Sequence, residues 1–119
     1  MDGASAPHVA YYDAVAGDLK YASRTAPGTW ATSTVEAAVD AGSVPVVALD
    51  GNGHAVIAYV DYASKDLKMA RFDGTAWVLS LIDAARDVTG VRGLALDAAG
   101  RAVVTYYDGT NGDLLLGRF

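Results

Sequence analysis

The sequence repeats one pattern at an interval of 47 to 48 residues, and this repeat constrains the fold more than any other feature of the chain. Its clearest part is an apolar run that ends in Tyr-X-Asp, with copies at 8–13, 56–61 and 103–108. A second aspartate follows five residues later in each copy, at Asp18, Asp66 and Asp113. The chain is therefore built from copies of one supersecondary unit.

Within each unit, β-branched and aromatic runs of five to seven residues alternate with Gly, Asp, Asn or Ser, a pattern typical of short strands joined by turns. The complete unit predicts strands at 44–50, 55–61, 67–71 and 77–82, and the first of these is repeated at 91–97. A repeat of this length with four strands is the size of one β-propeller blade. We therefore expect an all-β fold made of blades of four antiparallel strands, with ten strands in total.

Composition indicates a folded domain, because 52% of the residues are hydrophobic and only 19% are charged. The apolar runs are far shorter than the roughly 18 residues that cross a bilayer, and the first residues lack signal-peptide character, so no membrane partner is expected. The chain has no cysteine, which excludes disulfides and thiolate chemistry. With a net charge of −5 and scattered basic residues, nucleic acid is not an expected partner.

The repeat divides the single domain 1–119 into a partial blade at 7–43, a full blade at 44–90 and a partial blade at 91–119, about 2.5 blades in all. Closed propellers typically have four to eight blades, and an open row would expose sheet edges and apolar faces. We therefore expect a ring closed by head-to-tail homo-oligomerisation, as a dimer or a trimer. The alternative is that the sequence was cut from a longer repeat protein.

The turn segments of the repeat resemble those of known proteins. Residues 48–53 followed by 58–61, and 106–108 followed by 112–114, are similar to the repeats of bacterial propellers of the sialidase-like and lectin-like group. This resemblance covers 7–119 and implies blade architecture, whereas the group includes lectins, enzymes and proteins without an assigned role. Oligomeric propeller lectins, in which short chains assemble a ring, are a similar case and imply carbohydrate binding.

Sialidase-type enzymes carry a hairpin motif in which a Gly lies two residues after an Asp and an aromatic residue five residues after it. The matching hairpin has Gly74 directly after Asp73 and Trp77 only four residues after it, and the equivalent segment 25–30 has no Asp. An arginine cluster for a carboxylated sugar is not evident either. A piece of a sialidase-like glycosidase is thus the weakest of the alternatives.

The repeated tyrosines and aspartates have two interpretations. The aspartates end a strand before a four-residue loop, where a carboxylate accepts hydrogen bonds from the loop amides, and every copy needs this turn. Alternatively, each aspartate and its tyrosine line a sugar pocket, the aromatic face stacking on the ring and the carboxylate accepting hydroxyl protons. The candidate ligand-binding residues are then Tyr11, Asp13, Tyr59, Asp61, Tyr106 and Asp108. Such pockets are expected near the loops that follow the aspartates.

No metal or cofactor is expected from the sequence. The segment 50–53, Asp-Gly-Asn-Gly, is weakly similar to a calcium loop, but the equivalent segment 97–100 lacks the Asn, and neither has a second acid at ligand spacing. A hairpin turn explains both copies. The two histidines, His8 and His54, are not equivalent in the repeat, so a histidine metal site is not predicted.

Catalysis is not predicted. Glycoside cleavage needs two carboxyl groups about 5 to 10 Å apart in one cleft. Glu36 and Asp83, which match in the repeat, are expected at the outer rim of the blades and are badly placed for that. Trp30 and Trp77 also match, and packing between sheets is favoured over sugar stacking for both. Two hypotheses remain. The protein is a non-catalytic carbohydrate-binding propeller module, or it is a structural propeller fragment that self-assembles with no ligand.

Overall fold

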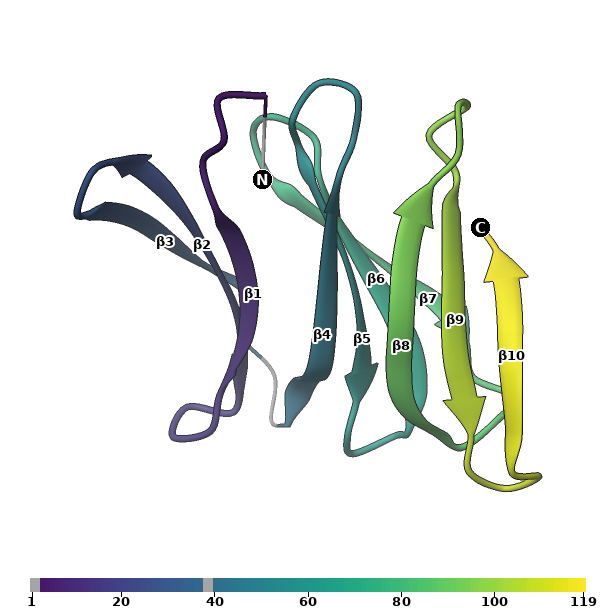
Figure 1. Ribbon diagram of the computed structural model, residues 1–119. Coiled ribbons are helices and arrows are strands. Elements are labelled where there is room, and N and C mark those ends of the chain that lie inside the picture. The colour runs from purple at the N-terminus through teal and green to yellow at the C-terminus, as the bar shows by residue number, and fades with distance from the viewer. Residues whose placement is uncertain (1–2, 38–39) are drawn as a thin grey trace.

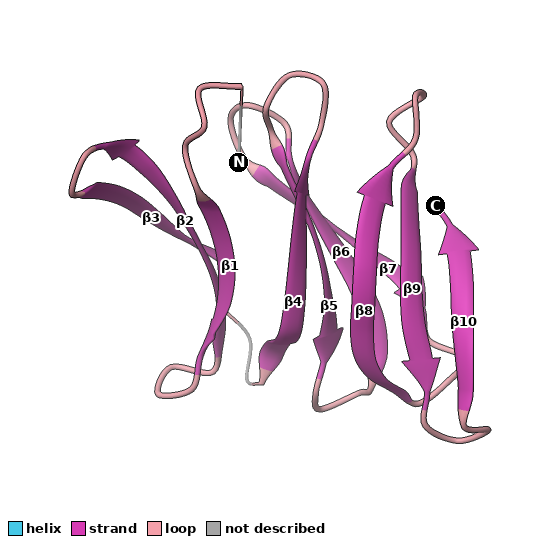
Figure 2. Ribbon diagram, in the orientation of Figure 1, coloured by secondary structure: helices cyan, strands magenta, loops and turns pink. Residues whose placement is uncertain are grey.

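The computed structural model describes residues 3–37 and 40–119, and every regular element in these ranges is a β-strand (Figure 2). The ten strands are β1 (His8–Asp13), β2 (Asp18–Ala26), β3 (Thr29–Glu36), β4 (Ala41–Leu49), β5 (Ala55–Asp61), β6 (Asp66–Phe72), β7 (Trp77–Asp83), β8 (Val88–Leu96), β9 (Ala102–Asp108) and β10 (Asp113–Arg118). The prediction of an all-β chain is confirmed for these residues. No helix among them could span a membrane.

The strands form three antiparallel sheets, each of which is a meander of sequential neighbours. The first sheet contains β1–β3, the second β4–β7 and the third β8–β10. Figure 1 shows the sheets arranged in a row, with β4 lying between β1 and β8, which it contacts on either side. The turns after β1, β5 and β9 all lie at the lower end of the sheets in that view.

The core lies in the two junctions between neighbouring sheets. In the first junction, Leu19 and Val35 of the first sheet pack against Ile57, Tyr59 and Ala70 of the second. The second junction is larger and is formed by Val56, Ala58, Val60, Leu67, Met69, Val88, Val91, Ala102, Val104 and Tyr106. Alternate residues of β5 thus face opposite neighbours, as the period of a strand requires. The apolar character of both faces of β5 follows from its position between two sheets.

The first strand of the repeat is longer than predicted, because β4 begins at Ala41 and β8 at Val88. Both strands contain pairing irregularities near their beginnings. In β4 these irregularities accompany Gly42 and Val44, which have positive φ angles of 92° and 48°. Gly42 and Ser43 precede the predicted strand 44–50, whereas a bulged strand accommodates both residues.

Candidate functional site

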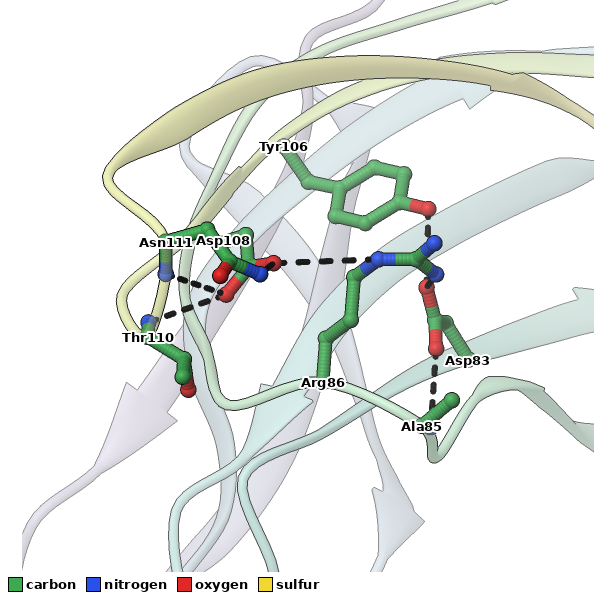
Figure 3. A network of polar contacts seen from close by, with 7 residues as sticks. All are labelled: Asp83, Ala85, Arg86, Tyr106, Asp108, Thr110 and Asn111. Carbon is green, nitrogen blue, oxygen red and sulfur yellow. Dashed lines mark hydrogen bonds and ion pairs between the residues drawn. The ribbon is translucent and has the colours of Figure 1, made fainter.

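Tyrosine and a carboxylate meet across each junction. In the second junction, the Tyr106 hydroxyl donates a 2.9 Å hydrogen bond to Asp83, which ends β7 of the second sheet (Figure 3). The guanidinium of Arg86, in the loop after β7, donates a 2.7 Å hydrogen bond to the same carboxylate. The Nε of Arg86 lies 3.7 Å from Asp108, which is buried. One cation therefore links two carboxylates from neighbouring sheets.

The first junction contains the same arrangement with a different cation. The Tyr59 hydroxyl donates a 2.7 Å hydrogen bond to Glu36, which ends β3 of the first sheet. Lys68 of β6 lies 2.9 Å from both Glu36 and Asp61. Glu36 and Asp83, the repeat counterparts, thus accept from the counterpart tyrosines. We call these groups of tyrosine, carboxylate, cation and turn aspartate the junction networks.

The cation comes from a different position of the repeat in each of the two junction networks. Lys68 comes from the third strand of its repeat, where the next repeat has Leu115. In the second junction Arg86 supplies the charge from the connecting loop instead. The cation is therefore kept although its position in the repeat is not, because two acidic groups in a partly buried site need a counter-charge.

Electrostatics keep the network groups in the protonation states that their contacts require. Burial favours the neutral carboxyl of Asp83 and Asp61, but hydrogen bonds to the charged form outweigh it and lower the pKa of both. The hydrogen bond from Asn111 is the main cause that lowers the pKa of Asp108. Burial, and then the hydrogen bond to Glu36, raise the pKa of Tyr59. General acid–base catalysis favours a pKa near the working pH. The pKa of each of these four groups is instead shifted away from neutral pH.

The aspartates proposed as sugar ligands make the predicted turns. Each one uses its Oδ1 atom to accept hydrogen bonds from the amides two and three residues further on. These aspartates are Asp13, Asp61 and Asp108. The turn interpretation is confirmed. The remaining oxygen of Asp61 and Asp108 faces the cation of a junction network, whereas Oδ2 of Asp13 lies 3.9 Å from Lys20.

The tyrosines proposed with them differ in exposure. Tyr59 and Tyr106 are buried in the two junctions, whereas Tyr11 lies on the outer face of the first sheet and is exposed. The structure thus brings Tyr59 near Asp61 and Tyr106 near Asp108, around one cation in each case. A role of these six residues in sugar binding stays a prediction.

A cavity of about 470 Å³ lies between the first and second sheets, at the opposite end of the strands from the junction networks. Its lining comes from the start of β1, from β2 and β3, from the turns before β5 and β7, and from the end of β6. The lining residues are of two kinds. Some carry an aromatic or imidazole ring, and the others are small residues, several of which carry a hydroxyl. The rings are His8, Tyr21, His54, Phe72 and Trp77.

The five rings form a continuous series across the cavity. Tyr21 and Trp77 make an edge contact with centroids 5.2 Å apart, and Trp77 lies 5.3 Å from Phe72. His54 packs on Phe72 with perpendicular rings, and His8 contacts Tyr21 through a hydrogen bond from the tyrosine hydroxyl or the imidazole. Trp77 packs between sheets, as predicted, and also faces the cavity. The same prediction is wrong for Trp30, which is 46% exposed because no sheet covers its side of the first sheet. Sequence analysis missed this site because its rings come from both sheets and do not recur together.

The lining is not repeated at the second junction. The repeat counterparts of His8, Tyr21 and Ser23 on the second sheet are Val56, Met69 and Arg71, and the counterpart of His54 is Arg101. The aromatic and hydroxyl character therefore belongs to the first junction. The networks at the other end of the sheets each contain a tyrosine, two carboxylates and one cation.

The loop 50–53 is a turn. Oδ1 of Asp50 accepts hydrogen bonds from the amides of Asn52 and His54, and Asp97 does the same with Ala99 and Arg101. The hairpin-turn interpretation is therefore confirmed for both copies. Among residues 3–37 and 40–119, no group of three or more acidic or histidine side chains could hold a metal ion.

No relative of the chain was found among known proteins. No family profile, no curated protein and no solved structure matches the chain. The evidence on function is therefore the geometry of the cavity and of the two junctions.

Proposed function

We propose that the protein is a non-catalytic carbohydrate-binding module of propeller type, in which the three sheets are blades and the cavity between the first two binds a sugar. The repeat supports the blade interpretation, since Tyr59 with Glu36 and Tyr106 with Asp83 occupy matching places in successive sheets. The row of meander sheets, packed face to face, supports it as well (Figure 1). Self-association would close such a row into a ring.

The observation that carries the binding proposal is the series of rings in the cavity, from His8 to His54. The apolar face of a pyranose packs on aromatic rings, while its hydroxyls need donors and acceptors. Ser23, Ser33 and Thr75 are among the residues that line the same cavity, and the Trp77 indole N–H donates a 3.4 Å hydrogen bond to the Ser33 hydroxyl. A volume of about 470 Å³ is within the range of small-molecule sites.

The chemistry of the lining favours a neutral ligand. Among the described residues that line the cavity, none is Asp, Glu, Lys or Arg. A sialic acid or a sugar phosphate would bury its charge there without a fixed counter-charge, which is unfavourable. We therefore expect a neutral mono- or disaccharide as the ligand.

The same lining supports a binding role over catalysis. The cavity residues offer no pair of carboxyl groups that could act as acid and base or nucleophile. Glu36 and Asp83 are held by Tyr59 and Tyr106 in separate junctions, at the other end of the strands.

A structural module without a ligand is the second candidate, and one observation favours it. Four of the residues that recur in the repeat have polar atoms engaged in turns or junction networks, namely Tyr59, Asp61, Tyr106 and Asp108. Recurrence of these residues is thus explained by folding alone.

Substitutions of cavity residues separate the two candidate functions. Binding of neutral glycans is first screened on an array and then measured by titration calorimetry with the best glycan. Trp77→Phe and Ser33→Ala should each weaken binding about tenfold or more, because they remove ring area or a hydroxyl from the site. Trp30→Phe is the matched control, since Trp30 is the repeat counterpart of Trp77 and does not line the cavity.

Two results would count against the cavity. If no neutral glycan binds, the structural candidate is favoured. If glycans bind with equal affinity to the wild type and to both cavity variants, the ligand lies elsewhere, and Asp61→Asn then tests the turn-loop pockets.

A further inference from the structure

The outermost faces of the row of sheets expose residues whose repeat counterparts are buried in the junctions. On the third sheet, Leu114 is 67% exposed and Leu116 69% exposed. Their counterparts on the second sheet, Leu67 and Met69, are 0% and 5% exposed because the third sheet covers them. We call this outer face of the third sheet, with Leu114 and Leu116, the tail face.

The first sheet has a matching outer face. Val9 is 41% exposed, whereas its counterpart Ile57 is 0% exposed and packs on the first sheet. Tyr11 and Trp30 are also exposed, although their counterparts Tyr59 and Trp77 contact the first sheet. We call the face with Val9, Tyr11 and Trp30 the head face. Both faces expose clustered apolar side chains, leucine on the tail face and valine with two aromatic residues on the head face, which is unusual for a surface in contact with water.

The internal junctions show what each face fits. In both junctions, the repeat counterparts of the tail-face residues on one sheet pack against the counterparts of the head-face residues on the next sheet. Leu67 and Met69 lie against the third sheet, and Leu19 lies in the same way against the second. Trp77 makes its edge contact with Tyr21, whose counterpart on the third sheet is Leu116. A tail face is thus the surface on which a head face packs.

The lysine at this place in the repeat has different partners on the head face and in the first junction. Lys68 lies 2.9 Å from both Glu36 of the preceding sheet and Asp61 of its own. Its counterpart Lys20 lies 3.7 Å from Asp18 and 3.9 Å from Asp13 and donates a 3.2 Å hydrogen bond to Thr34, all on its own sheet. The third sheet, β8–β10, has no strand in the place of β3, so the proposed contact rests on the apolar residues and not on this lysine.

We propose that the tail face of one copy packs on the head face of a second copy, and that two copies close a ring of six sheets through two identical contacts. Head-to-tail contacts either close by rotation or continue into filaments. Two copies of three sheets give six, within the four to eight blades usual for closed propellers, whereas three copies give nine. The proposal rests on the interpretation of the sheets as propeller blades in the proposed function.

Single-face variants test the contact and its direction. Leu114→Asp with Leu116→Asp blocks the tail face, and Val9→Asp with Tyr11→Asp blocks the head face. All four residues are exposed in one copy, so the fold of the monomer should persist. Val78→Asp is the matched control, because Val78 is an exposed apolar strand residue of the second sheet and belongs to neither the head face nor the tail face.

Light scattering coupled to size exclusion should give the mass of two chains for the wild type and for Val78→Asp. Each blocked variant should give the mass of one chain, with circular dichroism reporting an unchanged strand content. A 1:1 mixture of the two blocked variants at about 100 μM should recover a two-chain species, because one free head and one free tail remain.

Several results would overturn the proposal. These are a monomeric wild type, a blocked variant that still pairs with itself, a mixture that does not pair, or a wild type of three or more chains. Failure here would leave the sugar site untouched, since one copy supplies the whole cavity lining. Glycan titration of the blocked variants separates the two questions.

Discussion

Tyr59 of the second sheet and Glu36 of the first are joined by a 2.7 Å hydrogen bond that crosses the boundary between two repeats. The contact recurs between Tyr106 and Asp83 in the next junction. It fixes the register of neighbouring sheets at one end, where the strands alone offer only apolar surfaces that could slide.

Removing the hydroxyl should therefore destabilise the chain. Tyr59→Phe leaves Glu36 with one buried donor fewer and should lower the free energy of unfolding by about 1 to 2 kcal/mol. Tyr11→Phe, at the exposed counterpart, should change it by less than about 0.5 kcal/mol. Urea denaturation followed by circular dichroism measures both. Equal effects of the two substitutions would show that the contact adds nothing to stability.

The cation of the second junction should be replaceable from the position used in the first. Arg86→Ala should lower the melting temperature, because Asp83 and Asp108 lose a counter-charge that is itself partly in water. Adding Leu115→Lys to this variant should restore part of the loss, since lysine at this repeat position contacts both acids in the first junction. Leu115→Lys alone should destabilise the chain, because Leu115 packs against the larger core. Thermal denaturation of the four proteins completes the cycle.

Stability should be constant between about pH 5 and pH 9 and should fall on both sides. The carboxyl groups of Asp61, Asp83 and Asp108 have lowered pKa values in the folded chain. Their contribution is complete above the unfolded pKa of about 4 and is lost as the pH falls through the folded pKa. Tyr59, with a raised pKa, contributes below about pH 10 and loses its contribution as the pH rises further.

The alkaline part of this profile has its own control. In Tyr59→Phe the fall above pH 10 should be smaller, while the acidic fall should be unchanged. Melting temperature measured from pH 2.5 to pH 11.5 gives both limbs. A profile of Tyr59→Phe that parallels the wild type above pH 10 would assign the alkaline loss to other groups.

Gly42→Ala should destabilise the chain by several kcal/mol, as for substitutions that meet both strain and a clash. Gly42 has a φ of 92°, and an added Cβ would lie 2.4 Å from Cβ of Leu19 in the first junction. Gly51→Ala is the control, because no heavy atom lies within 4 Å of the position of its added Cβ. The two denaturation midpoints should differ clearly, and similar midpoints would mean that β4 can shift away from Leu19.

The repeat made most of the fold predictable, because the apolar runs and turn residues recur and the turn aspartates act locally. The strand 55–61 was predicted at its observed bounds, Ala55–Asp61. The first residues of β4, 41–43, were missed because Gly42 and Ser43 are typical of loops by composition, although a bulged strand holds them. Local patterns do not register a packing partner such as Leu19, which is distant in the sequence.

The candidate site was less predictable than the fold. The residues kept in every repeat include Asp61 and Tyr59, which complete a turn and a junction. The cavity rings Tyr21, His54 and Phe72 belong to three separate segments and face one another only after two sheets pack. The spacing of residues along one strand does not indicate that these three rings lie close together in the fold.

The two ends of each sheet are thus under different demands, and this makes the chain a divisible scaffold. Substitutions in the junction networks would alter the contacts that hold neighbouring sheets together. Substitutions around Tyr21 and Ser23 would alter which ligands the cavity accepts, while the sheets stay packed. Placing tyrosine and serine at Met69 and Arg71, the matching positions of the second sheet, is the direct way to write a second specificity into the same polypeptide.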